Sequence, residues 1–266
     1  MSAGKPVVLC FSGLDPSGGA GLQADAETLL GLGCHCAPVA TVLTVQDTLN
    51  ASRMVPVVAD LMAEQAHCVL ADMPVRCFKL GLLGSAATVK TVCGILRKHA
   101  DIPVVMDPVS AAGGGYAFAG PETLAAMREL LLPLATIVTP NSVELAQLAP
   151  EADTPDAAAG EVLRRGCRNV LLTGGHESGE YVVNRWLRAI DEAACKSSEF
   201  RWPRLEHEFH GSGCTLASAV AGNLALGRDM ESALREAQQY TWESLSRAWR
   251  AGAGQHLPER GFTRES

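Results

Sequence analysis

The chain has 266 residues, of which 47% are hydrophobic and 19% charged, and its formal net charge is −7. An acidic chain without a long Lys/Arg cluster is not expected to bind nucleic acid or an anionic membrane, because either partner requires a basic face. No apolar run approaches the length that spans a bilayer, and residues 1–6 show no secretory signal.

The nine cysteines are an odd number and lie scattered along the predicted strands and helices. Together with the lack of a recognisable signal, this pattern indicates reduced thiols rather than a disulfide framework. Cys34 and Cys36 are separated by one residue, which does not match the paired spacing of a structural zinc site. We therefore expect a cytoplasmic protein without structural zinc.

Apolar, β-branched runs alternate with helical patterns along almost the whole chain, which predicts an α/β fold with a largely parallel sheet and helices on both faces. Residues 180–204 lose the helical period and are typical of edge strands. We expect a single domain over residues 1–266, in which the tail 252–266 packs loosely. Strands are expected at 7–12, 37–45, 78–83, 104–107, 136–139 and 170–172, and helices at 22–32, 58–71, 86–99, 122–132, 143–148, 155–165, 213–226 and 231–250.

The strongest local pattern is the segment 210–215 (HGSGCT), which opens a helix rich in small residues. Glycines let the backbone approach a ligand, and the free N–H groups of residues 211–214 at a helix start form a site for phosphate. The positive end of the helix is expected to lower the pKa of the Cys214 thiol and make it a better proton acceptor. The alternative is a glycine-rich turn before an ordinary helix, with Cys214 a small buried residue.

A second glycine-rich loop spans residues 13–21, directly after the first predicted strand, and holds four glycines in nine residues. Its backbone can close over a small ligand, although a flexible turn is the alternative. No Gly-Lys-Ser/Thr follows, so the loop is not a P-loop. It also lacks the dinucleotide fingerprint, which disfavours a nicotinamide cofactor.

Polar side chains follow two further predicted strands. Asn141 and Glu144 stand three residues apart where a strand ends and a helix starts, which is first of all the pattern of a helix cap. The same arrangement leaves an amide oxygen and a carboxylate where hydrated Mg²⁺ could be held through water. Asp107 follows the strand at 104–106, where a carboxylate is costly unless it is paired, caps local amides or binds a metal.

Taken together and in order, seven segments resemble the hydroxymethylpyrimidine and phosphomethylpyrimidine kinases of the ribokinase superfamily. The resemblance implies a three-layer ribokinase-like fold with ATP and Mg²⁺ as cofactors. It also implies phosphorylation of 4-amino-5-hydroxymethyl-2-methylpyrimidine, and then of its monophosphate to the diphosphate, in thiamin biosynthesis. The segments are residues 13–25, 44–48, 79–83, 105–109, 139–144, 172–176 and 210–215.

The resemblance further implies a role for individual residues. Gln46 would hydrogen-bond the aminopyrimidine edge, with Gly13 and Asp25 bordering the same pocket. Cys214 would take the proton from the substrate hydroxymethyl group. By the same resemblance, Gly211, Ser212, Gly213 and Cys214 form the anion hole, Asn141 and Glu144 belong to the magnesium and phosphate motif with Asp107 close by, and Thr173, Gly174 and Gly175 flank the nucleotide.

Two positions depart from the family's pattern. Relatives often have a lysine in the segment after Asp-Pro-Val, where this chain has AAGGG at 111–115, and many have a lysine where this chain has Thr173. Magnesium, the anion hole and an arginine from elsewhere in the chain would then have to neutralise more of the phosphate charge.

Other functions stay open at this point. A pyridoxal or pyridoxine kinase would also act on a hydroxymethyl group of a flat ring, although Gln46 favours an aminopyrimidine. A non-catalytic vitamer-binding protein is conceivable because the lysines are missing, but the retained residues at 141, 144 and 211–214 weigh against it. We also expect His176 and His210 to border the site, and the protein to act on a small molecule as a homodimer.

Overall fold

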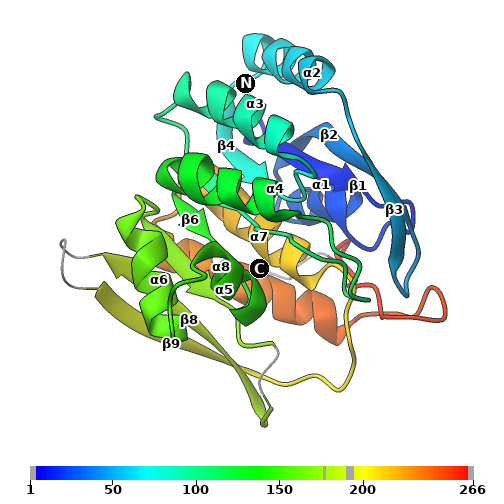
Figure 1. The fold of residues 1–266 in the computed structure, drawn as a ribbon. Coiled ribbons are helices and arrows are strands. Elements are labelled where there is room, and N and C mark those ends of the chain that lie inside the picture. The colour runs from blue at the N-terminus through cyan, green and yellow to red at the C-terminus, as the bar shows by residue number, and fades with distance from the viewer. Residues whose placement is uncertain (1–3, 176–177, 190–194, 263–266) are drawn as a thin grey trace.

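The structure is a computed structural model that describes residues 4–175, 178–189 and 195–262. A mostly parallel sheet runs through the middle of the described chain (Figure 1). Its strands are β1 (Val7–Leu14), β2 (His35–Gln46), β3 (Ala51–Pro56), β4 (Val75–Leu80), β5 (Val104–Met106), β6 (Ile137–Val138), β7 (Asn169–Leu172), β8 (Tyr181–Ala189) and β9 (Cys195–Pro203).

The strands follow the order β3-β2-β1-β4-β5-β6-β7-β8-β9. The six strands from β2 to β7 in this order run parallel to their neighbours, whereas β3, β8 and β9 are antiparallel at the two edges. The strands β5, β6 and β7 are short and almost entirely buried, as expected where helices cover both faces of a parallel sheet.

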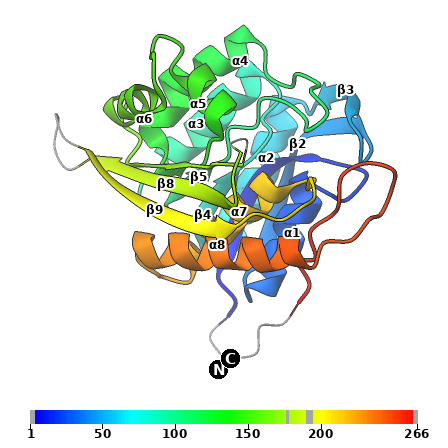
Figure 2. The same ribbon diagram turned by 90° about the horizontal axis from the view of Figure 1, so that it is seen from below.

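Helices cover both faces of the sheet, which gives three layers (Figure 2). One face carries α1, α7 and α8, and the other carries α2 to α6. The small side chains Ala217, Ala219 and Ala221 let α7 pack closely against the sheet. No described helix combines the length and the apolar character that crossing a bilayer requires. The helices are α1 (Gly21–Gly31), α2 (Ala59–Asp72), α3 (Ala86–Arg97), α4 (Pro121–Ala126), α5 (Ser142–Leu148), α6 (Pro155–Arg164), α7 (Ser212–Ala225) and α8 (Met230–Ser246).

The predicted α/β fold is confirmed, with two local differences. The strand β3 was not predicted, because its sequence ASRMVP shows no regular alternation of apolar and polar residues and four of its six residues are exposed. The helix predicted at 122–132 is α4 followed by a π-helical turn (Met127–Leu131) and a 3₁₀ turn (Leu132–Leu134). Pro133 lies in that last turn and cannot donate a helical hydrogen bond.

The C-terminal segment differs from the loosely packed tail that we expected at 252–266. Within its described part, Arg260 is only 2% exposed. Its guanidinium group donates to the Gly19 carbonyl oxygen (2.5 Å), the Thr215 hydroxyl (2.8 Å) and a carboxylate oxygen of Glu27 (3.1 Å). A planar group with five N–H donors can bind three acceptors at once, so this part of the tail is fixed. The single-domain organisation over residues 1–266 stays a prediction.

Candidate active site

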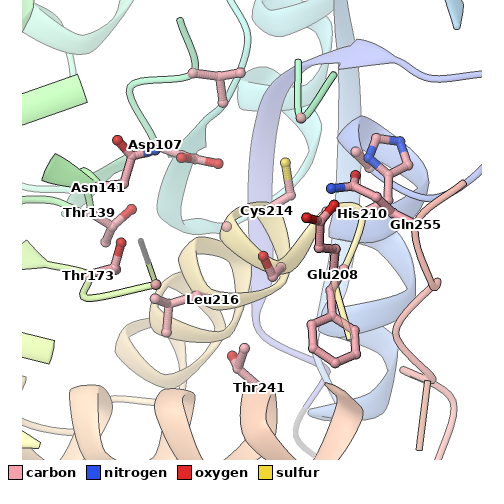
Figure 3. Close-up of a pocket in the computed structure, with 18 of the residues that line it drawn as sticks. Asp107, Thr139, Asn141, Thr173, Glu208, His210, Cys214, Leu216, Thr241 and Gln255 are labelled. Atoms are coloured by element: carbon pink, nitrogen blue, oxygen red, sulfur yellow. The ribbon is translucent and has the colours of Figure 1, made fainter. Parts of the chain in front are cut away.

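A cavity of about 770 Å³ opens at the carboxyl ends of the parallel strands, where loops lead into helices. It is lined from both sides of α7: Figure 3 shows Cys214 at the start of this helix, with Asp107, Asn141 and Thr173 to one side of it and His210 to the other. The cavity therefore brings together loops that are far apart in the sequence. Of the residues predicted for the site, the lining includes Gly13, Gln46, Asp107, Asn141, Glu144, Thr173, Gly175, Gly211, Ser212, Gly213 and Cys214.

The segment predicted to be the anion loop lies at the first turn of α7. Gly211 is the N-cap residue and has a φ of 81°, a left-handed conformation that favours glycine. A Cβ atom at this position would also collide with the Gly19 carbonyl oxygen. Among the described residues no side chain caps the first turn of α7, so its free N–H groups are available to a ligand in the cavity.

The Cys214 thiol lines the cavity, but its pKa shifts in the direction opposite to our prediction. Burial is the largest cause and raises the pKa of Cys214 to about 12; the Asp107 and Asp25 carboxylates raise it as well, and the Lys79 ammonium opposes them. The expected lowering by the helix end is wrong, because desolvation and two nearby negative charges outweigh it. The resting group at neutral pH is therefore the neutral thiol.

We predicted that Asp25 borders the cavity, and this is wrong: Asp25 is buried and does not line it. Its Oδ1 atom is 2.7 Å from Lys79 Nζ, and neither side chain is exposed. The Ser218 hydroxyl donates to the same oxygen (2.7 Å), and Lys79 also donates to the Ser12 hydroxyl (3.0 Å). Desolvation lowers the pKa of Lys79, but the charge of Asp25 raises it, and the net shift is upward. The lysine therefore stays charged.

Residues 79–83 resemble a segment of the family, but we predicted no role for Lys79. The sequence did contain a sign that Lys79 has a buried acidic partner: a lysine in the strand sequence VRCFKL is costly to bury unless a carboxylate faces it. The partner lies 54 residues earlier in the chain, and nothing in the local sequence indicates it.

Asn141 and Glu144 form the capping box that their spacing predicts. The Asn141 side chain accepts from the Glu144 backbone N–H (2.9 Å), and the Glu144 carboxylate accepts from the Asn141 N–H (3.0 Å). Both residues also line the cavity. Burial, followed by the charge of Asp107, raises the pKa of Glu144 to about 8.

Asp107 and Glu144 together fit a cation that carries phosphate. Burial is the largest cause that raises the pKa of Asp107, to about 6, and its Oδ2 atom has no hydrogen-bond partner in the described structure. Two crowded carboxylates with an orphaned oxygen are a favourable environment for a positive ion. No group of three or more His, Cys, Asp or Glu in the described ranges could hold a metal. The two carboxylates of Asp107 and Glu144 instead suit Mg²⁺, which is commonly bound by one or two carboxylates together with phosphate and water.

The opposite end of the cavity contains Gln46, Asp15 and His210. The Asp15 carboxylate oxygen Oδ2 lies 2.7 Å from His210 Nε2, and the same ring nitrogen lies 3.2 Å from Gln46 Nε2. Asp15 and His210 are 4% and 7% exposed. His210 was expected to border the site and does so, whereas Asp15 was missed as an individual residue because its partner is 195 positions away.

The segment predicted to flank the nucleotide is only partly in the cavity. Thr173 and Gly175 line it, but Gly174 does not. The Gly174 N–H donates to Asn184 Oδ1 (3.0 Å), and a Cβ atom there would collide with the backbone of Val183. Gly174 therefore packs against β8 and does not face the cavity. His176, also expected near the site, lies outside the described residues.

Two side chains lie near the segments in which the family resemblance led us to look for lysines. Gln255, from the C-terminal segment, has its Oε1 atom 2.7 Å from the place that a Cβ of Gly113 would occupy. Arg204 lines the cavity and donates to the carbonyl oxygens of Gly175 (3.3 Å) and Gly179 (2.7 Å). Arg204 is the type of residue that we expected to supply charge from elsewhere in the chain.

Solved structures with the same architecture give the class of protein. The ADP complex of a pyridoxal kinase from Bacillus subtilis superposes with a TM-score of 0.82 at 26% identity, covering 96% of this chain and 97% of that one. A phosphomethylpyrimidine kinase from Clostridium difficile 630 gives a TM-score of 0.75 at 29% identity, covering 91% and 100%. The fold is thus the ribokinase-like fold of small-molecule kinases, as the resemblance implied.

Sequence comparison narrows this class. The family model described as phosphomethylpyrimidine kinase matches residues 15–259. A hydroxymethylpyrimidine/phosphomethylpyrimidine kinase from Streptomyces coelicolor is 38% identical over 257 residues, which are 94% of this chain and 92% of the relative. The chain therefore belongs to the phosphomethylpyrimidine kinase family.

Proposed function

We propose that the protein transfers the γ-phosphoryl group of ATP to the hydroxymethyl oxygen of 4-amino-5-hydroxymethyl-2-methylpyrimidine, and then to the resulting monophosphate, in thiamin biosynthesis. One observation carries the proposal: a single cavity holds a carboxamide for a heteroaromatic edge, a helix start for phosphate and two carboxylates for a cation. The names of the relatives support the same reaction.

The α7 start supplies the phosphate side of the reaction. Its N–H groups would face the developing negative charge of a transferring phosphoryl group, and such preorganised donors lower the barrier because they need no rearrangement. Asp107 and Glu144 would hold Mg²⁺ through oxygen atoms and water, and the ion would neutralise phosphate charge when bound. Thr173 and Gly175 would border the nucleotide, consistent with their place in the cavity.

In this proposal, Cys214 accepts the proton of the substrate hydroxymethyl oxygen. Its sulfur stands at the anion loop and inside the cavity. Because burial raises the pKa of this thiol to about 12, the role requires extra positive charge that lowers the pKa once ligands occupy the site. Lys79 already acts in that direction.

A pyridoxal kinase activity is the second candidate, and one observation favours it. Pyridoxal kinases from Bacillus subtilis and Staphylococcus aureus superpose with TM-scores of 0.82 and 0.85, above the 0.75 of the phosphomethylpyrimidine kinase structure. Both vitamers offer a hydroxymethyl group on a flat ring. We propose the pyrimidine as the main substrate because Gln46 can pair with both the donor and the acceptor of an aminopyrimidine edge.

We further propose that the protein is a cytoplasmic homodimer. All nine cysteines carry free thiols in the structure, which supports a reducing compartment such as the cytoplasm.

The proposed dimer contact is an apolar patch on the paired strands β2 and β3. Its side chains Leu43, Val45 and Val55 are 48%, 47% and 50% exposed. An exposed apolar patch beside an edge strand is a common site of association.

The function is tested with purified protein, Mg-ATP and three acceptors: the hydroxymethylpyrimidine, its monophosphate and pyridoxal. Mass spectrometry of the products separates monophosphate from diphosphate. We expect both pyrimidine products, with a higher kcat/KM for the pyrimidine than for pyridoxal. A higher kcat/KM for pyridoxal would replace the proposal by its second candidate, and monophosphate alone after long incubation would remove the second transfer. ATP consumption with none of the acceptors phosphorylated would contradict both.

A further inference from the structure

The ionisation state of Asp15 determines the hydrogen bonds at the substrate end of the cavity. Its carboxylate accepts from the Ser17 N–H, the Ser17 hydroxyl and the Ala20 N–H, each at 2.9 Å, in addition to the contact with His210. Burial alone raises the pKa of Asp15, but hydrogen bonds from His210 and Ser17 bring it below the ordinary value. Asp15 is therefore a carboxylate at neutral pH, and a carboxylate only accepts hydrogen bonds.

It follows that His210 carries a hydrogen on Nε2, which it donates to Asp15 over 2.7 Å. A ring nitrogen that donates has no lone pair left for another donor. Gln46 Nε2 lies 3.2 Å from this nitrogen, so two N–H donors would face each other. A half-turn of the carboxamide about its last torsion exchanges its nitrogen and oxygen and converts this contact into a shared hydrogen bond from His210 to Gln46 Oε1.

We infer that His210, held by Asp15, is a positioning residue that fixes the Gln46 carboxamide with its oxygen toward His210 and its NH₂ group on the opposite side. This inference rests on the proposed function. An aminopyrimidine edge has an amino donor next to a ring-nitrogen acceptor, so it pairs with a fixed carboxamide in one direction only. The amino group of the substrate then lies on the His210 side of Gln46, and the ring nitrogen accepts from the Gln46 NH₂.

The surroundings of His210 hold the imidazole in place. Its backbone N–H donates to the His256 carbonyl oxygen (2.9 Å), and its ring packs so closely on Gly19 that a Cβ atom there would collide with it. Arg260 binds the Gly19 carbonyl oxygen from the other side. Because His210 directly precedes Gly211, the group that orients the carboxamide is continuous in the chain with the loop that binds phosphate.

The geometry favours this role over proton transfer from substrate by His210 itself. In a histidine–aspartate pair that acts as a base, one ring nitrogen faces the carboxylate and the other faces the substrate. Here the same atom, Nε2, is directed at both Asp15 and Gln46. His210 is thus turned toward the binding side chains, and the thiol of Cys214 remains the group at the anion loop.

The inference is tested with His210→Leu, Gln46→Ala and the double variant, on the aminopyrimidine and on its analogue without the 4-amino group. We expect His210→Leu to lower kcat/KM for the aminopyrimidine about 10- to 100-fold, mainly through KM, because the Gln46 carboxamide loses a hydrogen-bond partner that fixes its orientation. For the analogue without the amino group we expect a change below about threefold, and the double variant should be no worse than Gln46→Ala, since both remove one shared interaction. His67→Leu, at an exposed position of α2, is the matched control and should change neither substrate.

Equal losses on the two substrates, or losses of His210→Leu and Gln46→Ala that multiply, would overturn the inference. A second measurement does not depend on turnover: long-range ¹H–¹⁵N spectra of the wild-type protein with labelled histidine. We expect His210 to carry its hydrogen on Nε2, and Asp15→Asn to change this signal. Hydrogen on Nδ1 in the wild type would sink the inference even if the pyrimidine is a good substrate. If the wild type phosphorylates no pyrimidine, the proposed function fails while this spectrum still decides the position of the hydrogen.

Discussion

Lys79 on β4 and Asp25 on α1 form an ion pair with 2.7 Å between Nζ and Oδ1, and solvent reaches neither side chain. The pair lies close to α7, where Ser218 donates to Asp25. The charge of Lys79 acts on both Cys214 and Asp107. The protein thus keeps a lysine charge next to Cys214 and Asp107, although its loops lack the two lysines that the family resemblance led us to look for.

Lys79→Met should destabilise the protein by about 3–5 kcal/mol, because it leaves the Asp25 carboxylate buried without its counter-charge. Urea unfolding followed by circular dichroism measures this change. Arg201→Ala, which breaks the exposed pair of Arg201 with Glu199, is the control and should cost less than about 1 kcal/mol. Equal losses for the two variants would contradict the importance of the buried pair.

Cys214→Ser should keep the fold and lower kcat about 10²- to 10⁴-fold, the range typical for the loss of a group that moves a proton. KM for the pyrimidine should change little, since recognition of the ring lies with Gln46. Cys68→Ser, at an exposed position, is the matched control. Steady-state kinetics with both substrates varied makes the comparison, and an unchanged kcat for Cys214→Ser would exclude the thiol from proton transfer.

Two glycines of the anion loop should respond differently to alanine. Gly211→Ala places a side chain at φ 81° against the Gly19 carbonyl oxygen, so we expect a loss of at least about 1–2 kcal/mol in stability. At Gly213 the nearest atom to a new Cβ is Asp107 Oδ1 at 3.8 Å, an ordinary contact, and stability should be kept. Thermal unfolding of the two variants tests the difference. The same melting temperature for both would argue against the left-handed cap.

The ligand-free protein should lose stability as the pH rises from about 4.5 to about 8. The pKa of Glu144 is raised from 4.5 to about 8 in the folded chain, so the folded state binds more protons than the unfolded state between these values. The free energy of unfolding therefore falls with rising pH in this window. Urea unfolding between pH 5 and 9 should show a shallower decline for Glu144→Gln and an unchanged one for Glu129→Gln, an exposed control. A decline of the same slope in Glu144→Gln would rule out this carboxylate as a cause.

Val55→Lys should weaken the proposed dimer, because it places a charge in the apolar patch of Leu43, Val45 and Val55. Sedimentation velocity over a range of concentrations should show dimers for the wild type and a shift to monomers for the variant. Leu30→Lys, which changes an exposed leucine on α1, should sediment as the wild type does. A wild type that stays monomeric at the highest concentration would remove the homodimer proposal.

The periodicity of the sequence was sufficient to predict the α/β layers, because buried strands and amphipathic helices leave local patterns. The capping box at Asn141 and Glu144 was predictable for the same reason, since both hydrogen bonds lie within four residues. Lys79 with Asp25, and Asp15 with His210, could not be paired from the sequence, because each contact depends on how separate elements pack. The pKa of Cys214 was predicted in the wrong direction because the sequence indicates the helix start but not the burial and the two carboxylates around it.

Arg260 lies near the C-terminus of the chain, so its contacts with Gly19 and Thr215 are among the last that can form. During synthesis, the segments that carry Gly19 and Thr215 leave the ribosome well before residue 260. Until residue 260 is added, the chain lacks the guanidinium group that joins these two loops. The contacts of Arg260 with these loops therefore form last, and a chain cut before residue 260 would lack the side chain that joins the Gly19 loop to the first turn of α7.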